Sequence, residues 1–145
     1  MRIEALADSA EADREAVRAM LAAANAEAGH PHAQQVLLIA LRDAGGSLQG
    51  GAIARIAWRW LFVETLAVAP ALRGRGWGAR LLRAAEREAR ARGCVGARLD
   101  TYSFQARGFY EKQGYGVAGA ISDCPPGQTR YTMFKRLHEA QGETA

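Results

Sequence analysis

Residues 61–92 read LFVETLAVAPALRGRGWGARLLRAAEREARAR. The pattern predicts a strand over residues 61–68, a turn rich in glycine and arginine, and a long helix that begins near Gly76. Glycines let the backbone approach a ligand closely, and a helix start offers unpaired N–H groups and a partial positive charge. This turn is therefore predicted to bind phosphate oxygens.

The glycine spacing narrows the choice of phosphate ligand. Residues 74–79 fit the G-x-G-x-x-A form of a dinucleotide fingerprint. In that fingerprint the first glycine follows its strand almost immediately, whereas here residues 69–73 separate the strand from Gly74. No Gly-Lys-Ser or Gly-Lys-Thr follows, as a nucleoside-triphosphate loop requires. Asp100, about twenty residues past Ala79, keeps a dinucleotide-binding enzyme open as an alternative.

Two motifs indicate a different ligand. The spelling V-x-P-x-x-R-G-x-G-x-G over residues 68–78 resembles the acyl-coenzyme A loop of the GNAT superfamily of N-acetyltransferases. Residues 106–115, ARGFYEKQGY, resemble the A-x-x-F-Y-x-x-x-G-F/Y helix of the same superfamily, at the expected distance. The S-F-Q-A segment at residues 103–106 and the P-x-G loop at residues 125–127 are similar to those of a small bacterial group within it. The resemblance covers residues 35–137.

The resemblance implies a mixed α/β fold, with a curved, mostly antiparallel sheet, helices on both faces and one β-α-β crossover over residues 61–101. A chain of 145 residues is expected to form a single domain, here residues 1–138, followed by a disordered polar tail, residues 139–145. The residue pattern predicts strands over residues 2–6, 35–42, 47–57, 94–101, 115–121 and 130–137, and helices over residues 12–28, capped by Asp8 and Ser9, and 104–113.

The implied activity is direct transfer of an acetyl group from acetyl-coenzyme A to a primary amine of an unidentified small-molecule acceptor. No Ser-His or Cys-His signature indicates a covalent enzyme intermediate. No metal is expected, because His30 and His32 flank Pro31 without a third ligand close by. A non-catalytic acyl-coenzyme A sensor and a dinucleotide-binding enzyme are the alternative functions.

The resemblance assigns acid and base roles. Tyr110 occupies the position of the general acid that protonates the departing thiolate. Glu64, four residues before Val68, is where many relatives carry an acidic residue that deprotonates the incoming ammonium, and Asp100 and Asp123 remain alternatives. The alternation of this strand predicts that four side chains share one face: Phe62, Glu64, Leu66 and Val68.

Coenzyme contacts are implied for the strand end, the glycine turn and the second motif. They are Leu66, Ala67, Val68, Arg73, Gly74, Arg75, Gly76, Trp77, Gly78, Ala79, Ser103, Gln105 and Phe109. Ser103 stands where the family pattern has an asparagine, so that contact is expected to be lost or bridged by water, with Gln105 as a replacement.

The net charge of +4 is concentrated between Arg73 and Arg98, which contains eight arginines and two acidic residues. A solvated helix face is predicted for the arginines at helical spacing: Arg80, Arg83, Arg87 and Arg90. Glu86 and Glu88 each stand four residues before an arginine, a spacing that favours ion pairs. No recognition helix, zinc spacing or aromatic RNA-binding signature accompanies the charge, so no nucleic acid is expected as a partner. The chain has no apolar run of membrane-spanning length. We expect a cytoplasmic protein that binds a small-molecule amine, and a homodimer is compatible with the resemblance.

Overall fold

A computed structural model describes residues 1–137 of the chain. The tail predicted over residues 139–145 lies outside the described residues, and the single domain over residues 1–138 stays a prediction. The chain divides into two compact units, Met1–Ala33 and Gln34–Ala145. Within the described residues, no helix is long and apolar enough to span a membrane.

The first unit contains helix α1 (Glu11–Glu27), which confirms the first predicted helix. Two other predictions for this unit are wrong. No side chain among the described residues caps α1, so Asp8 and Ser9 do not have that role. Residues 2–6 form no strand, because the described first unit contains no other strand beside which they could lie.

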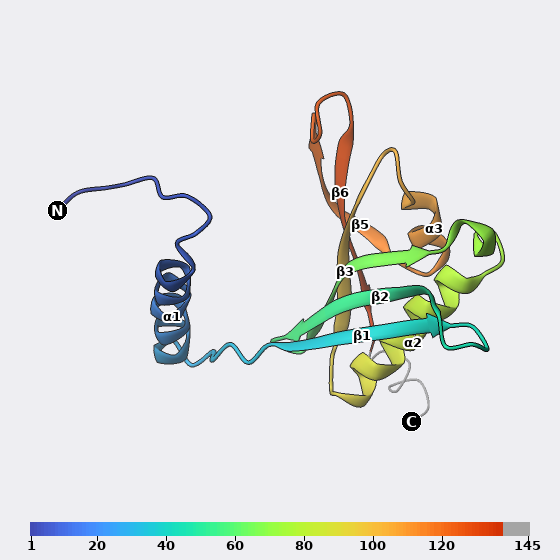
Figure 1. The fold of residues 1–145 in the computed structure, drawn as a ribbon, viewed down its shortest axis with the longest axis horizontal. Helices are drawn as coiled ribbons and strands as arrows, with labels where there is room; N and C mark the ends of the chain where they lie inside the picture. Colours follow the sequence, from blue (N-terminus) through green and yellow to red (C-terminus); the bar gives the residue numbers. More distant parts are fainter. Residues whose placement is uncertain (138–145) are drawn as a thin grey trace. The chain divides into compact units, whose positions relative to one another are not determined.

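The second unit is built on a six-stranded sheet in the order β1-β2-β3-β4-β6-β5 (Figure 1). All neighbouring strands are antiparallel except β3 and β4, which are parallel and joined through helix α2. The elements of this unit are β1 (Gln35–Arg42), β2 (Leu48–Ala57), β3 (Trp60–Val68), the short 3₁₀ helix η1 (Pro70–Leu72), α2 (Trp77–Ala91), β4 (Gly96–Tyr102), α3 (Arg107–Lys112), β5 (Gly116–Ser122) and β6 (Thr129–Arg136). The predicted mixed α/β fold with a mostly antiparallel sheet and one crossover is confirmed.

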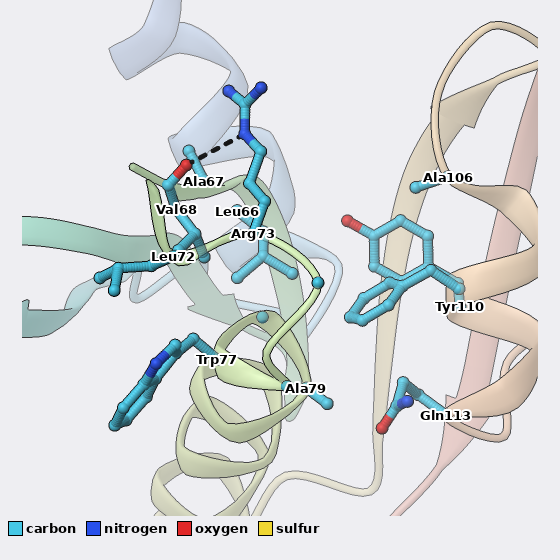
Figure 2. A pocket seen from close by; sticks show the side chains of 14 residues that line it. Leu66, Ala67, Val68, Leu72, Arg73, Trp77, Ala79, Ala106, Tyr110 and Gln113 are labelled. Carbon is cyan, nitrogen blue, oxygen red and sulfur yellow. Dashed lines mark hydrogen bonds between the residues drawn. The ribbon is translucent and has the colours of Figure 1, made fainter. Parts of the chain in front are cut away.

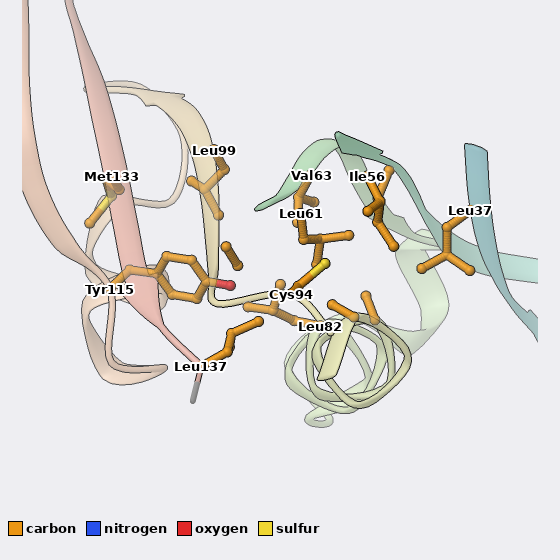
Figure 3. Packing of buried hydrophobic residues seen from close by; sticks show 14 residues of the cluster. Leu37, Ile56, Leu61, Val63, Leu82, Cys94, Leu99, Tyr115, Met133 and Leu137 are labelled. Carbon is orange, nitrogen blue, oxygen red and sulfur yellow. The ribbon is translucent and has the colours of Figure 1, made fainter. Parts of the chain in front are cut away.

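The core of this unit lies between the sheet and helix α2 (Figure 3). Leu61 from β3 and Leu82 from α2 are completely buried there. Phe109 and Tyr110 from α3 pack against the same cluster. Both helices therefore cover the same face of the sheet, and the presence of helices on both faces stays a prediction.

Helix α3 is shorter than the helix predicted over residues 104–113. The residues before it are held in turns: the Ser103 N–H donates to the Thr129 carbonyl at 2.9 Å, and the Gln105 N–H donates to the Tyr102 carbonyl at 2.9 Å. The first of these bonds ties the segment to β6. Because its amides are used in this way, the helix begins only at Arg107.

A β-bulge interrupts β3 at Glu64. Val63 pairs with Ala54 and Thr65 pairs with Ile53, so Glu64 has no strand-pairing partner on β2. A bulge inserts one residue and reverses the alternation beyond it. Leu66 consequently pairs with Ala52 on the buried face. The prediction that Phe62, Glu64, Leu66 and Val68 share one face is therefore wrong.

The two parallel strands separate after the bulge. β3 and β4 pair only from residues 60–63 to residues 96–99. Beyond this point β3 continues to pair with β2 as far as Val68, and β4 continues to pair with β6 as far as Tyr102. One edge of each strand is thus left without a strand partner, and a gap opens between them.

Helix α2 carries its arginines largely as predicted. Three of them are exposed: Arg80, Arg83 and Arg87. The fourth, Arg90, is half-buried. Glu88 pairs with Arg92 at 3.5 Å, as its spacing predicts. The prediction for Glu86 is wrong, since this side chain is only 1% exposed and contacts Tyr115 and Lys135 instead of a solvated arginine.

Candidate active site

The gap between β3 and β4 opens onto a cavity of about 490 Å³. The end of β3, the glycine turn, the first turn of α2 and helix α3 surround it (Figure 2). Most of the residues predicted to contact coenzyme line this one cavity: Leu66, Ala67, Val68, Arg73, Gly74, Gly76, Trp77, Gly78, Ala79 and Phe109. Tyr110 lines it as well, so the two sequence motifs meet in space.

The glycine turn leads directly into α2. Gly74 and Gly76 have φ values of +71° and +82°, a region that strongly favours glycine. The first hydrogen bond of the helix runs from the Arg80 N–H to the Gly76 carbonyl at 3.2 Å. Three amides at the helix start therefore have no partner within the helix: those of Trp77, Gly78 and Ala79. With the positive end of the helix dipole behind them, they suit the oxygens of a diphosphate.

The two arginines of the turn differ in position. Arg73 lines the cavity, and its Nε donates to the Val68 carbonyl at 3.4 Å, which links the turn to the end of β3 (Figure 2). Arg75 is exposed and does not line the cavity. Arg73 is therefore the better placed of the two for a phosphate contact.

Tyr110 projects from α3 into the cavity, with its hydroxyl directed toward the side formed by β3 and the glycine turn (Figure 2). Its ring packs edge-on against Phe109, with ring centroids 5.0 Å apart, and against Tyr115 at 6.0 Å. Burial raises the pKa of Tyr110 above its ordinary value of about 10. The hydroxyl therefore keeps its proton near neutral pH and is able to donate it.

Glu64 does not line the cavity. Its carboxylate forms an ion pair with Arg55 of β2, and the Arg55 guanidinium also lies over the Phe62 ring at 5.2 Å. A base at this position would have to act through water or after this ion pair opens.

The alternative bases also have partners. Asp100 accepts hydrogen bonds from Arg130 Nη2 at 2.5 Å and from the Thr132 hydroxyl at 2.9 Å. The Asp123 carboxylate accepts the Gly127 N–H at 2.8 Å and so closes its own loop. Neither side chain lines the cavity. Position alone thus favours none of the three carboxylates as the base.

Ser103 and Gln105 lie outside the cavity lining. The Ser103 hydroxyl donates to Gln128 Oε1 at 2.6 Å and accepts the Thr129 N–H at 2.9 Å, so it fastens the loop before β6. Gln105 Oε1 lies 3.5 Å from the Thr101 hydroxyl. Ser103 thus connects the segment before α3 to the loop before β6, and Gln105 contacts the end of β4.

Three residues that line the cavity were not predicted as site residues: Leu72, Ala106 and Gln113. Leu72 and Ala106 lie within the quoted motifs, where a small or apolar residue gives no chemical signal. Gln113 follows Tyr110 by three residues, and i, i+3 spacing places such residues on one helix face. That spacing could have indicated its position.

Metal-binding groups are not found in the described part of the chain. Among residues 1–137, no three or more His, Cys, Asp or Glu side chains gather closely enough to hold a metal ion. Cys94 and Cys124 are both free thiols.

The fold and the cavity are those of a class of enzymes, the acyltransferases that use an acyl-coenzyme A, and comparison with known proteins identifies the family. Residues 3–115 match the model of the acetyltransferase (GNAT) family. The chain belongs to this family and is an acetyl-coenzyme A-dependent acyltransferase.

Relatives and solved structures agree with this assignment. The chain is 44% identical over 93 residues to blasticidin-S acetyltransferase of Streptomyces morookaense, covering 63% of this chain and 68% of that protein. It is 37% identical over 133 residues to an acetyltransferase of Agrobacterium fabrum, covering 91% and 97%. The crystal structure of an acetyltransferase from Bacillus cereus superposes with a TM-score of 0.85 at 26% identity, covering 94% of this chain and 98% of that one.

The residues present fit an acyl-coenzyme A. Free amides of the first turn of α2 suit the diphosphate, and the parted strands offer backbone groups to an extended amide-containing arm. Leu66 and Leu72 add apolar surface to the lining of the cavity. The coenzyme, when bound, supplies an activated thioester carbonyl.

Proposed function

We propose that the chain transfers an acetyl group directly from acetyl-coenzyme A to an amino group of a small molecule. One observation carries this proposal: Tyr110 and the free amides at the start of α2 line the same cavity, on opposite sides of it. A bound thioester would then have its diphosphate at one end and a proton donor near its sulfur at the other. The small-molecule acceptor is supported by the name of the Streptomyces relative, which refers to blasticidin S.

The proposed roles follow from the positions of the side chains. The amides of residues 77–79 hold the diphosphate, with Arg73 beside them. Tyr110 donates its proton to the departing thiolate. Backbone N–H groups at the unpaired edge of β3 stabilise the negative charge that develops on the thioester oxygen.

Direct transfer is favoured over a two-step route. The described lining of the cavity contains no serine, cysteine or histidine that could attack the thioester. The amine must lose a proton before it becomes a nucleophile, and Glu64, acting through water, is the proposed base.

A screen of acetyl-coenzyme A consumption against primary amines, with blasticidin S among them, tests the proposal. We expect saturable turnover with at least one amine and a product that carries one added acetyl group by mass spectrometry. Binding of acetyl-coenzyme A without turnover of any amine would favour a sensor instead. Stronger thermal stabilisation by a nicotinamide dinucleotide than by acetyl-coenzyme A would favour a dinucleotide enzyme.

The base is tested in the same assay with three matched variants: Glu64→Gln, Asp100→Asn and Asp123→Asn. Loss of a general base lowers the rate by about a hundredfold or more. We expect this loss only in Glu64→Gln, together with a changed pH–rate profile. Full activity of Glu64→Gln across the pH range would exclude Glu64 as the base.

A further inference from the structure

Glu86 is the unusual charged residue of the second unit. Of the charged side chains in residues 1–137, it alone is buried. Its Oε2 accepts the Tyr115 hydroxyl at 2.8 Å, and its Oε1 accepts Lys135 Nζ at 3.0 Å. We refer to Glu86, Tyr115 and Lys135 as the Glu86 cluster. Burying a carboxylate is costly even when it is paired, so an apolar residue here would often be as stable.

The Glu86 cluster lies where α2 and α3 meet. Glu86 belongs to α2, which also carries the proposed diphosphate site. Tyr115 follows α3 closely, and its N–H donates to the Tyr110 carbonyl at 3.0 Å. Lys135 Nζ donates also to the Gln113 carbonyl at 2.9 Å. The carboxylate thus connects α2 to both the backbone of Tyr110 and the end of α3.

Other contacts between these helices are less directional. Phe109 lies against Gly78, where an added Cβ would be 3.5 Å from the Phe109 ring. Arg83 Nη1 is 3.4 Å from Gln113 Oε1, near the limit for a hydrogen bond. Hydrogen bonds to an ionised group are shorter and stronger than such contacts, and they fix geometry more tightly.

We propose that Glu86 is a positioning residue that, through Tyr115 and Lys135, fixes the place of α3 and hence of the Tyr110 hydroxyl in the cavity. The inference rests on the proposed role of Tyr110 in acetyl transfer. A displacement of about 1 Å of a reacting group is enough to lower a rate by about a hundredfold. Precise placement of α3 would therefore account for a carboxylate that is buried at a cost in free energy.

The first test is amide hydrogen exchange of the free protein, which needs no activity. Glu86→Gln keeps the side-chain size, but its NH₂ group cannot accept a hydrogen bond, so the amide oxygen can accept only one of the two. We expect exchange in residues 107–115 to accelerate about tenfold, with residues 77–82 unchanged. Glu88→Gln, on the exposed side of the same helix, is the matched control and should leave both segments unchanged.

The second test is kinetic. Glu86→Gln should lower kcat about tenfold and change KM for acetyl-coenzyme A by less than about twofold. In a Tyr110→Phe background the same substitution should have no further effect on kcat, because a residue that acts through Tyr110 has nothing left to position. An equal loss of kcat in both backgrounds would overturn the inference.

A milder variant, Tyr115→Phe, removes one hydroxyl and keeps the ring, so it decides the exchange test if Glu86→Gln does not fold. Unchanged exchange in residues 107–115 of Tyr115→Phe would then contradict the inference. If the wild-type protein acetylates no amine, the proposed function fails, and exchange alone decides whether Glu86 holds α3.

Discussion

The two halves of β3 differ in pairing, burial and contacts. Residues 60–63 pair with β2 on one side and with β4 on the other, and Leu61 and Val63 are buried in the core. Residues 65–68 follow the bulge at Glu64, pair only with β2, and lead to the cavity. The first half of β3 is thus anchored in the sheet on both sides, whereas the second half has an open edge beside the cavity. We expect changes in the first half to affect stability, and changes around the second half to affect binding and turnover.

The largest expected effect lies in the anchored half. Leu61→Ala removes a fully buried side chain and should lower the free energy of unfolding by about 2 to 5 kcal/mol, measured by urea denaturation. Thr65→Ala, in the exposed part of the open half, should change it by less than about 0.5 kcal/mol. Equal losses of unfolding free energy from the two substitutions would contradict the expected difference between the two halves of β3.

The next effect concerns turnover. Tyr110→Phe keeps the ring packing but removes the proposed proton donor, so kcat should fall about a hundredfold. The melting temperature should stay close to that of the wild type. Steady-state kinetics with the best amine of the screen, beside thermal denaturation, measures both quantities. A variant with wild-type kcat would remove Tyr110 from the mechanism.

A smaller effect is expected at the turn beside the open half. Gly76→Ala forces a side chain into a left-handed conformation that costs about 1 kcal/mol, and the turn should shift to relieve it. The Kd for coenzyme A should rise about tenfold by calorimetry. Gly108→Ala is the control, since an added Cβ there meets no atom within 4 Å and its φ lies outside the left-handed region. Equal weakening by both would show that the turn geometry is not decisive.

The smallest expected effect is a loss of stability at alkaline pH through Tyr115, which is buried in the core. Burial raises the pKa of Tyr115 well above its ordinary value, and the carboxylate of Glu86 and the hydroxyl of Tyr110 raise it further, whereas Arg90 lowers it. The Lys135 ammonium lies 5.7 Å from its ring. The unfolded tyrosine ionises at a pH of about 10, so this group's contribution to stability is complete below that pH and declines above it.

This decline can be measured directly. Between about pH 9 and about pH 11 the melting temperature of the wild type should fall more steeply than that of Tyr115→Phe. Parallel curves would show that Tyr115 ionises equally easily in the folded and unfolded chains.

The resemblance of two short motifs to the GNAT superfamily was enough to predict the fold and most of the residues that line the cavity. In the glycine turn and in the segment around Tyr110, residues adjacent in the sequence determine the local backbone conformation. Glu86 was misjudged because its partners are 29 and 49 residues away in the chain, and helical spacing alone pairs it with Arg90. The hydrogen bond from Ser103 to Gln128 spans 25 residues and could not be predicted from the sequence for the same reason, and the coenzyme contact of Ser103 stays a prediction.

The bulge in β3 has a consequence for how this chain tolerates change. Glu64 has no partner on β2, so exchanging it for another amino acid would break no backbone pair. Deleting it would remove the bulge and restore the two-residue repeat, with Leu66 and Val68 still on the same side of the sheet as Val63. A strand that kept Glu64 but had no bulge would turn Leu66 and Val68 to the opposite side of the sheet. The bulge, more than the identity of the residue at position 64, therefore governs which side chains the strand presents to the cavity.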